Sequence, residues 1–497
     1  MRMFNKSKLL LLFVFFIIIV SLTMKFSYAI FSHEENFNNS ISLTSAVDFS
    51  VIPNIEDYYV YIDNNSQEYI DFFQESYDMG LFIPEEVFDE AQLVEYYKNL
   101  NISYMDNGYT VKLNDKFKEA LNNNTNYVDS LGNTWLAGSP LPNPGSMYNG
   151  SSGVGKVTSM ERMFYRITAT TLDLSIYDTK NITNMSWMFR SNTSTNLNIS
   201  GLDTAQVVSM RLLFYETSAQ NIDVSNFDTS NVVDMHGLFS RTNTSIIDVS
   251  GFNTSNVEIM TSMFYKTVAP LIDVSGFDTS NVVDMGMMFS SSVAKVIDVS
   301  NFNTSRVTNM NLMFHRSNAS VIDVSRFDTS NVVDMQLMFA YSLVKNLNIS
   351  GFKTSNVENM RGMFYRVESS ILDVSGFDTS KVTDMWAMFH NTKATVIDVS
   401  NFDTGNVINM ADMFSGSLVK NLDVSNFNTS KVTDMSDMFM YIQVPVIDLR
   451  SFNFASVTNM SNMCLLGNGI TIYVKNQTDK NLVVNSGNAN INKVVIK

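Results

Sequence analysis

A methionine recurs every 25 residues through most of this chain, and this strict period is the feature that most limits what the chain can fold into. These column methionines stand at positions 160, 185, 210, 235, 260, 285, 310, 335, 360, 385, 410, 435 and 460. A phenylalanine follows four residues later in each copy, from Phe164 to Phe439, until Cys464 takes that position. Since no copy gains or loses a residue, every copy fills the same volume and can bury its apolar face by stacking on the next. The period therefore predicts a solenoid with one shared core.

Each copy carries a strand pattern and a helix pattern, as residues 222–239 illustrate. "IDVS" alternates apolar and polar residues, which is typical of a short strand with Ile222 and Val224 facing inward. "NVVDMHGLF" places apolar residues at offsets 0, 3, 6 and 7, which is a helical spacing. Asn231 stands where an N-cap belongs, and Asp234 follows three residues later as in a capping box. We therefore expect a repeat solenoid, leucine-rich-repeat-like, with one short parallel β-strand plus a short helix per 25-residue coil.

Composition divides the chain into five parts. Residues 1–29 read as a signal peptide, and 30–137 as a small N-terminal α+β region of open role, with a helix at 85–100 and a strand followed by a helix in "GYTVKLNDKFKEALNNN". Residues 138–155 concentrate Gly, Pro, Ser and Asn and are expected to form a linker or cap. The repeat solenoid is expected over 156–466, and 467–497 is expected to close it as a C-terminal cap.

The first residues indicate export. Arg2, Lys6 and Lys8 precede an apolar run from Leu9 to about Thr23, and the small-residue triplet that ends at Ala29 follows. This is the layout of a secretory signal peptide cleaved after Ala29, and the alternative is an uncleaved membrane anchor. We expect a secreted or cell-surface location in either case, and how the protein is retained at the surface stays open.

The overall composition argues against several functions. The formal net charge is −16 and the pI about 4.7, without a basic block, so nucleic-acid binding is disfavoured. A single cysteine excludes an internal disulfide framework. The four histidines are scattered, and no nucleophile elbow, phosphate loop or HExxH motif is present. We expect neither enzyme activity nor a cofactor.

The repeat words resemble those of BspA-like leucine-rich-repeat surface proteins, in the 25-residue variety of low-GC bacteria and mycoplasmas. The resemblance rests on "IDVSNFDTSNVVDMHGLF" (222–239), "IDVSNFNTSRVTNMNLMF" (297–314) and "LDVSGFDTSKVTDMWAMF" (372–389), and it covers about 156–466. It implies an exported surface protein used in adhesion to hosts, matrix or other cells, without enzyme activity. Ordinary leucine-rich repeats have Asn or Cys after the strand, where this chain has Phe227, so the familiar horseshoe curvature is not implied. We expect Phe227 to point back into the core.

Two positions just after each column phenylalanine vary while the frame around them repeats. Aromatic and basic residues are frequent there, and such side chains anchor interfaces. The competing interpretation is that an unconstrained surface column drifts. Our ligand-binding hypothesis names Tyr165, Arg166, Tyr215, Arg241, Tyr265, Lys266, His315, Arg316, Tyr341, Tyr365 and Arg366.

Three other columns have a plain structural interpretation. The column methionines and Cys464 are expected in the core, not at a metal site or a reactive centre. One aspartate per coil is expected on the outer face of the strand, where stacked carboxylates repel one another. Hydration and Ser or Thr hydroxyls can relieve this repulsion, and bound calcium is a weaker alternative. The aspartates concerned are Asp223, Asp248, Asp273, Asp298 and Asp323.

Taken together, these features favour a secreted or cell-surface adhesin that binds a protein or glycan on another cell or matrix through the exposed faces of its solenoid. The alternative is a structural stalk that presents a binding domain within residues 30–137. The identity of the ligand and the oligomeric state cannot be read from the residues.

Overall fold

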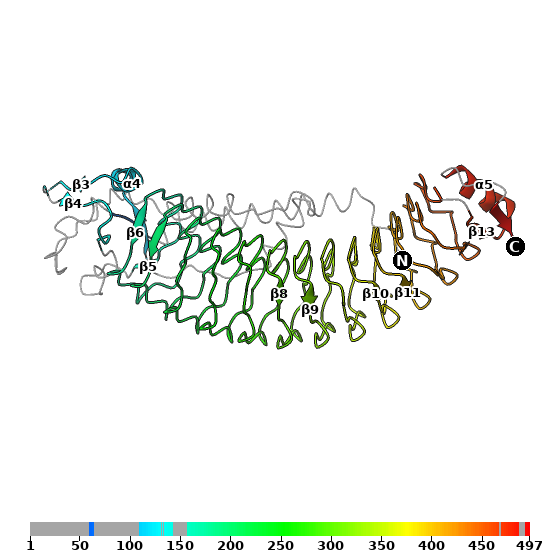
Figure 1. Ribbon diagram of the computed structural model, residues 1–497, viewed down its shortest axis with the longest axis horizontal. Coiled ribbons are helices and arrows are strands. Elements are labelled where there is room, and N and C mark those ends of the chain that lie inside the picture. Colours follow the sequence, from blue (N-terminus) through cyan, green and yellow to red (C-terminus); the bar gives the residue numbers. More distant parts are fainter. Residues whose placement is uncertain are drawn as a thin grey trace, which may run out of the picture. The chain divides into compact units, whose positions relative to one another are not determined.

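The computed structural model describes residues 59–63, 109–130, 132, 134–142, 157–466, 469–486 and 493–497. The predicted signal peptide, the helix expected at 85–100 and most of the expected linker at 138–155 lie outside these residues. The repeats form a solenoid whose coils follow one another in sequence order (Figure 1).

The predicted strand is present in most coils and pairs in parallel with its neighbour 25 residues away, but residues 221–224, 346–349 and 421–424 form no strand pairing. It is short, and in some coils it is reduced to a single bridge such as Ile247 with Ile272. Ile222 and Val224 are buried and Asp223 is exposed, as the alternation predicts. The paired strands are β6 (Thr171–Asp173) with β7 (Asn196–Asn198), β8 (Val296–Ile297) with β9 (Val321–Ile322), and β10 (Ile371–Leu372) with β11 (Val396–Ile397).

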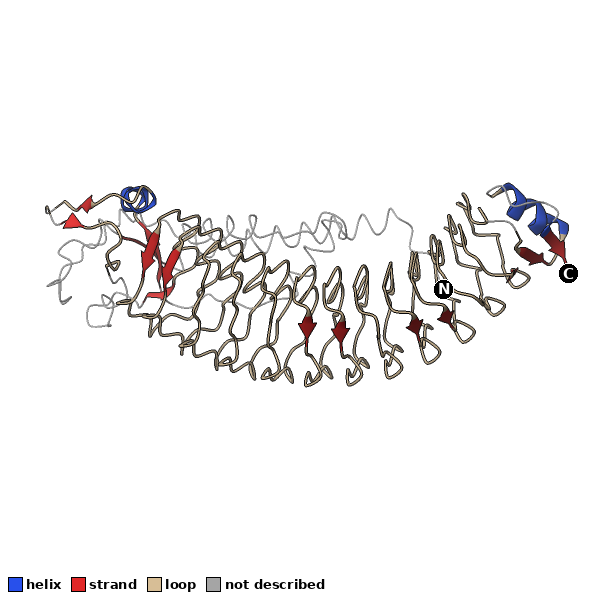
Figure 2. Cartoon of the chain, in the orientation of Figure 1, coloured by secondary structure: helices blue, strands red, loops and turns tan. Residues whose placement is uncertain are grey.

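The prediction of a short helix in each coil is wrong. Residues 157–466 contain turns at that place and no helix (Figure 2). In the coil of Met210, the N–H groups of Met210, Leu212 and Phe214 donate to carbonyls of the next coil, at 2.7–3.0 Å. A helix would direct these donors to carbonyls four residues back in its own chain. In the stacked coils these N–H groups bond to the neighbouring coil instead. The apolar spacing of 0, 3, 6 and 7 therefore arises from consecutive turns.

The residue before each column methionine forms a second parallel ladder. Single bridges join Ser159, Asn184, Ser209, Asp234 and their successors through to Asn459 without a gap. Asp234 therefore does not form the capping box proposed for it. Its carboxylate accepts the N–H of His236, two residues on, at 2.8 Å. Asn231, the proposed N-cap, donates from its amide to the carbonyl of Ala205 in the preceding coil, at 2.7 Å.

The core is filled by the same side chains in every coil. The column phenylalanines stack ring on ring from Phe164 to Phe439, with centroids 5.4–6.1 Å apart. The column methionines from Met160 to Met435 are fully buried beside them. Cys464 is also fully buried, and burial raises the pKa of its thiol to about 12, so it is an inert core residue as expected.

A ladder of threonine hydrogen bonds joins the coils to one another. Phe227 is buried, as predicted, and Thr229 two residues later donates its hydroxyl to the carbonyl of Asn253 in the next coil, at 2.9 Å. Equivalent threonines from Thr179 to Thr429 repeat this bond. One hydrogen bond per coil thus satisfies a part-buried carbonyl of the next coil.

The first coils are covered by residues that precede the repeats. The strand and helix predicted in "GYTVKLNDKFKEALNNN" are present as β2 (Tyr109–Leu113) and α4 (Asp115–Asn122). β2 pairs antiparallel with β1 (Tyr59–Asp63) and parallel with β5 (Val157–Ser159), the first strand of the repeats. The short hairpin β3 (Tyr127–Val128) and β4 (Thr134–Trp135) follows α4, and Trp135 packs edge-on against Phe117. The described part of this region is thus continuous with the solenoid.

The last coils end in a parallel three-stranded sheet. β12 (Val446–Asp448) pairs with β13 (Thr471–Val474), which pairs with β14 (Val494–Ile496). Helix α5 (Gln477–Asn485) lies between the last two strands in sequence, and its N-cap Asn476 accepts the N–H of Asp479 at 2.8 Å. These elements occupy the edge that the final coil would otherwise leave unpaired.

Candidate interaction surface

One surface of the solenoid is built by the turns that follow each column methionine. We call it the turn face and define it as the residues one, two, five and six positions after each column methionine. The turns begin because the Asn, Asp or Ser side chain before the methionine accepts the N–H two residues on, as Asn184 does from Ser186 at 2.8 Å. Such side chains are typical turn formers.

Two positions of the turn face require a left-handed backbone. The second and sixth residues after the column methionine have φ between 51° and 63°, as at Leu212 and Glu216. In the described coils these positions hold Gly, Arg, Ser, Leu, Asn and similar residues, but no Val, Ile or Thr. β-branched side chains are strongly disfavoured at positive φ, so the backbone restricts what otherwise varies freely.

The structure brings all the predicted ligand-binding residues onto this face but gives them different exposures. The basic side chains at the sixth position are exposed: Arg166, Arg241, Lys266, Arg316 and Arg366. Tyr165, Tyr341 and Tyr365 are half-buried. The face therefore offers cationic groups first and aromatic rings beneath them.

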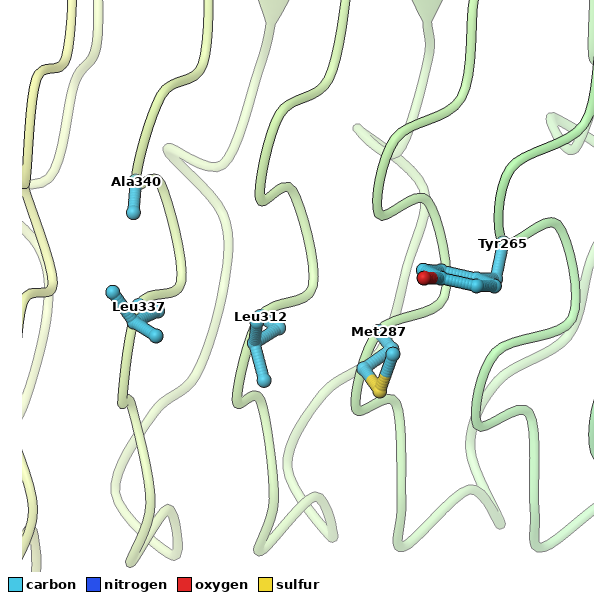
Figure 3. Packing of buried hydrophobic residues seen from close by; sticks show 5 residues of the cluster. All are labelled: Tyr265, Met287, Leu312, Leu337 and Ala340. Atoms are coloured by element: carbon cyan, nitrogen blue, oxygen red, sulfur yellow. The ribbon is translucent and has the colours of Figure 1, made fainter. Parts of the chain in front are cut away.

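Tyr215, Tyr265 and His315 are buried, so they support the face and do not present a ring to a partner. Tyr265 begins a buried apolar cluster that continues over the following coils through Met287, Leu312, Leu337 and Ala340 (Figure 3). Burial and the nearby Arg316 and Lys266 lower the pKa of His315 to about 4, so its ring is neutral at pH 7. Burial raises the pKa of Tyr215 to about 12. The loop position alone did not reveal that these side chains turn toward neighbouring coils.

Aromatic rings hold the cationic groups in place. The guanidinium carbon of Arg166 lies 4.9 Å from the ring centroid of Tyr165, and that of Arg316 lies 5.0 Å from the centroid of Tyr341. The ammonium nitrogen of Lys266 lies 5.1 Å from the ring of Tyr265. Cation–π contacts of this kind are worth about 0.5–1 kcal/mol at exposed sites. They limit the freedom of long side chains before any partner arrives.

Sequence reasoning missed one group of turn-face residues around Tyr365. The ring of Tyr365 stacks on His390 at 4.6 Å and on Trp386 at 6.0 Å. The guanidinium of Arg361 lies 4.0 Å from the ring of Trp386. His390 Nδ1 lies 3.2 Å from a carboxylate oxygen of Asp412 in the following coil. These residues occupy positions one, two or five after a column methionine, so the same 25-residue alignment could have identified them.

The opposite charge prevails on the outer face of the strands. Asp248 and Asp273 each accept the hydroxyl of the serine two residues on, at 2.7 Å. Hydrogen bonds from serine lower the pKa of Asp223, and they do so at Asp248, Asp273 and Asp323 as well. Asp298 makes the same bond with Ser300 at 2.6 Å. Over the described residues, no group of three or more His, Cys, Asp or Glu side chains is arranged to hold a metal ion, so the calcium alternative gains no support.

A model of one protein family matches the repeats. It is described as "Mycoplasma protein of unknown function, DUF285", and it matches residues 158–271, 241–339, 267–375 and 367–471. These overlapping matches cover more than half of the chain. The chain belongs to this family.

Every predicted ligand-binding residue lies inside the region that the DUF285 model matches. No curated protein and no solved structure matches the chain. The described residues include no helix that is long and apolar enough to cross a membrane. The family and the solenoid together identify a DUF285 repeat protein, and its role is a matter for proposal.

Proposed function

We propose that this protein is an exported, BspA-like adhesin of the cell surface that uses its turn face to bind acidic macromolecules of a host, a matrix or another cell. The observation that carries the proposal is the set of exposed basic side chains in five of the nine coils from Arg166 to Arg366, on a chain whose net charge is −16. Opposite charges at a surface speed encounter and select partners.

The rigidity of the frame supports this proposal. Each coil is hydrogen-bonded to the next through the turn backbone and the threonine ladder. The cationic groups therefore have fixed spacing, and several weak contacts with one large partner can form together. Arg241 illustrates the arrangement, because Tyr215 accepts its N–H at 3.0 Å and Glu216 pairs with it at 3.0 Å.

The alternative of a stalk that presents residues 30–137 has less support. The described residues of that segment are joined to the first coils, since Thr168 and Thr170 donate backbone N–H groups to Asn122 and Asn124, at 2.9 and 2.7 Å. This is the arrangement of a cap. A binding domain on a stalk would keep its polar groups and its surface for a partner.

The test replaces the five exposed cations with serine, the residue that Ser191 and Ser291 already provide at the same position of other coils. The matched control removes five exposed cations elsewhere, so that both variants change the net charge equally. We expect binding of the purified chain to host-cell surfaces to fall at least roughly tenfold in the first variant and to weaken with salt in the native chain. Equal binding by both variants would exclude the turn face. The first set is Arg166, Arg241, Lys266, Arg316 and Arg366, and the control set is Arg306, Arg326, Lys353, Lys381 and Lys431.

A further inference from the structure

A row of exposed aliphatic side chains runs along the outer face of the strands. The residue that opens each strand points outward, and seven of the nine coils from Ile246 to Val446 have Ile, Leu or Val there. These side chains are 37–65 % exposed: Ile246, Leu271, Val296, Val321, Ile371, Val396 and Val446. We call them the aliphatic row. Single exposed aliphatic residues are ordinary, but a row of them, here interrupted at Asn346 and Asn421, marks an interaction surface.

The fold does not require aliphatic residues at these positions. The same column holds Asn196, Asn221, Asn346 and Asn421 in other coils. Those coils keep their place in the second ladder, although the coils of Asn221, Asn346 and Asn421 form no strand pairing. Each member of the row thus has a polar replacement that the solenoid already accommodates. The aliphatic side chains therefore add stability only when a partner buries them. Apolar area removed from water is worth about 25 cal/mol per Å².

We propose that the aliphatic row is a self-association surface, on which a second copy of this chain docks through the same row. The row repeats once per coil, and neighbouring strands are spaced by about 4.8 Å. A partner with another spacing would lose register after a few coils. A second copy has the same spacing by construction, so all members of the row can pair along its whole length.

Charges beside the row favour a parallel pair of solenoids. The corner residue before the row is neutral or basic, with Lys295, Lys345 and Lys420 exposed. On the other side runs the acidic column that includes Asp298 and Asp323. A two-fold axis parallel to the solenoid axis places the basic edge of each copy over the acidic column of the other, and each row residue faces its own counterpart. An antiparallel pair would oppose aspartate to aspartate, which repels.

The size of the row fits a reversible dimer. Nine coils at about 4.8 Å and an outward strand face of about five residues at ~3.3 Å give roughly 700 Å² per copy. Stable interfaces bury about 800 Å² per partner, so the expected association is weaker than that of an obligate dimer. Two chains of net charge −16 also repel, and the association is expected at physiological ionic strength, where this repulsion is screened.

The experiment measures the mass of the full chain against concentration by analytical ultracentrifugation. Asparagine replaces Ile246, Leu271, Val296 and Val321 in one variant, and the control replaces the exposed Val333 and Ile408, which lie outside the row. We expect the native chain and the control to dimerise and the row variant to associate at least roughly 100-fold more weakly. Asn346→Val, which fills the gap in the row, is expected to tighten the dimer.

A monomeric native chain, or a row variant that dimerises like the native chain, would overturn the proposal. A chain that stays monomeric and loses host-cell binding on the same four substitutions would assign the row to a different partner and overturn it as well. Oxidation of Val296→Cys tests the parallel arrangement, since the native Cys464 is buried and cannot compete. We expect a disulfide-linked dimer from this variant and none from Val333→Cys, and the absence of the first would exclude parallel pairing.

Discussion

Asp334 is an acidic residue in a column position where the neighbouring coils have uncharged asparagines. It stands in the ladder before the column methionines, where Asn309 and Asn359 occupy the adjoining coils. Its carboxylate accepts the N–H of Gln336 at 2.8 Å and the amide of Asn311 at 3.3 Å. Burial, with a smaller contribution from the carboxylate of Asp284, nevertheless raises its pKa to about 6.

This shift predicts a pH dependence with a definite sign. The folded chain binds the proton of Asp334 below about pH 6, and the unfolded chain binds it only below about pH 4. The ionised carboxylate of Asp334 therefore opposes folding at pH 7, and protonation removes this cost as the pH falls from 7 to 4, so the folded state gains about 2 kcal/mol in total. Asp334→Asn should lack this gain. The check is the free energy of unfolding of native and variant chains across this range, and a difference between them that does not change with pH would contradict the assignment.

Individual side chains were predictable from the sequence where the period alone decides their environment. The column methionines and phenylalanines and Phe227 are buried as expected, because one strict period admits one interior. Tyr215, Tyr265 and His315 were expected to reach a ligand and are buried. Their direction depends on the left-handed turn beside them, and no spacing of apolar residues encodes it.

At the scale of the element, the turn is the unit that the sequence pattern concealed. Apolar offsets of 0, 3, 6 and 7 describe a helix and this pair of turns equally well, because both return to the core after three or four residues. The destination of the N–H groups distinguishes them: Leu212 donates to His236 in the next coil, at 2.7 Å. Such pairing between coils cannot be inferred from one copy read in isolation.

The turn also predicts which substitutions the coil tolerates. Ser291 has φ of 56° in the coil of Met285, the conformation that Gly416 adopts at the same position of a later coil. Ser291→Gly should leave stability nearly unchanged, whereas Ser291→Val should lower the free energy of unfolding by about 1–2 kcal/mol, because a β-branched residue is strained at positive φ. Chemical denaturation of both variants measures this contrast. Ser320→Val, at an exposed position without positive φ, is the control, and equal effects at both positions would refute the role of the turn.

At the scale of the whole molecule, the residues that hold the solenoid together differ from those that its surfaces present to partners. Stability is the sum of interfaces between neighbouring coils, so no single coil holds a unique core. The turn face and the aliphatic row lie on parts of each coil that the core leaves free to vary. The strict period revealed the stacking and the parallel strands in advance. The turn face was predicted only in part from the sequence, because the side chains that build it come from coils 25 or 50 residues apart.

Deletion of one period tests the stacking most directly. Removing residues 281–305 joins Ser280 to Arg306 and restores the word "TSRV" of the native sequence, one coil shorter. Removing residues 281–292 takes about half a coil and puts the ladders, the phenylalanine stack and the threonine bonds out of step. Stacking in register predicts that the first variant unfolds cooperatively near the native temperature, and that the second loses its folded structure by circular dichroism. A half-period deletion that folds normally, or a full-period deletion that does not fold, would contradict it.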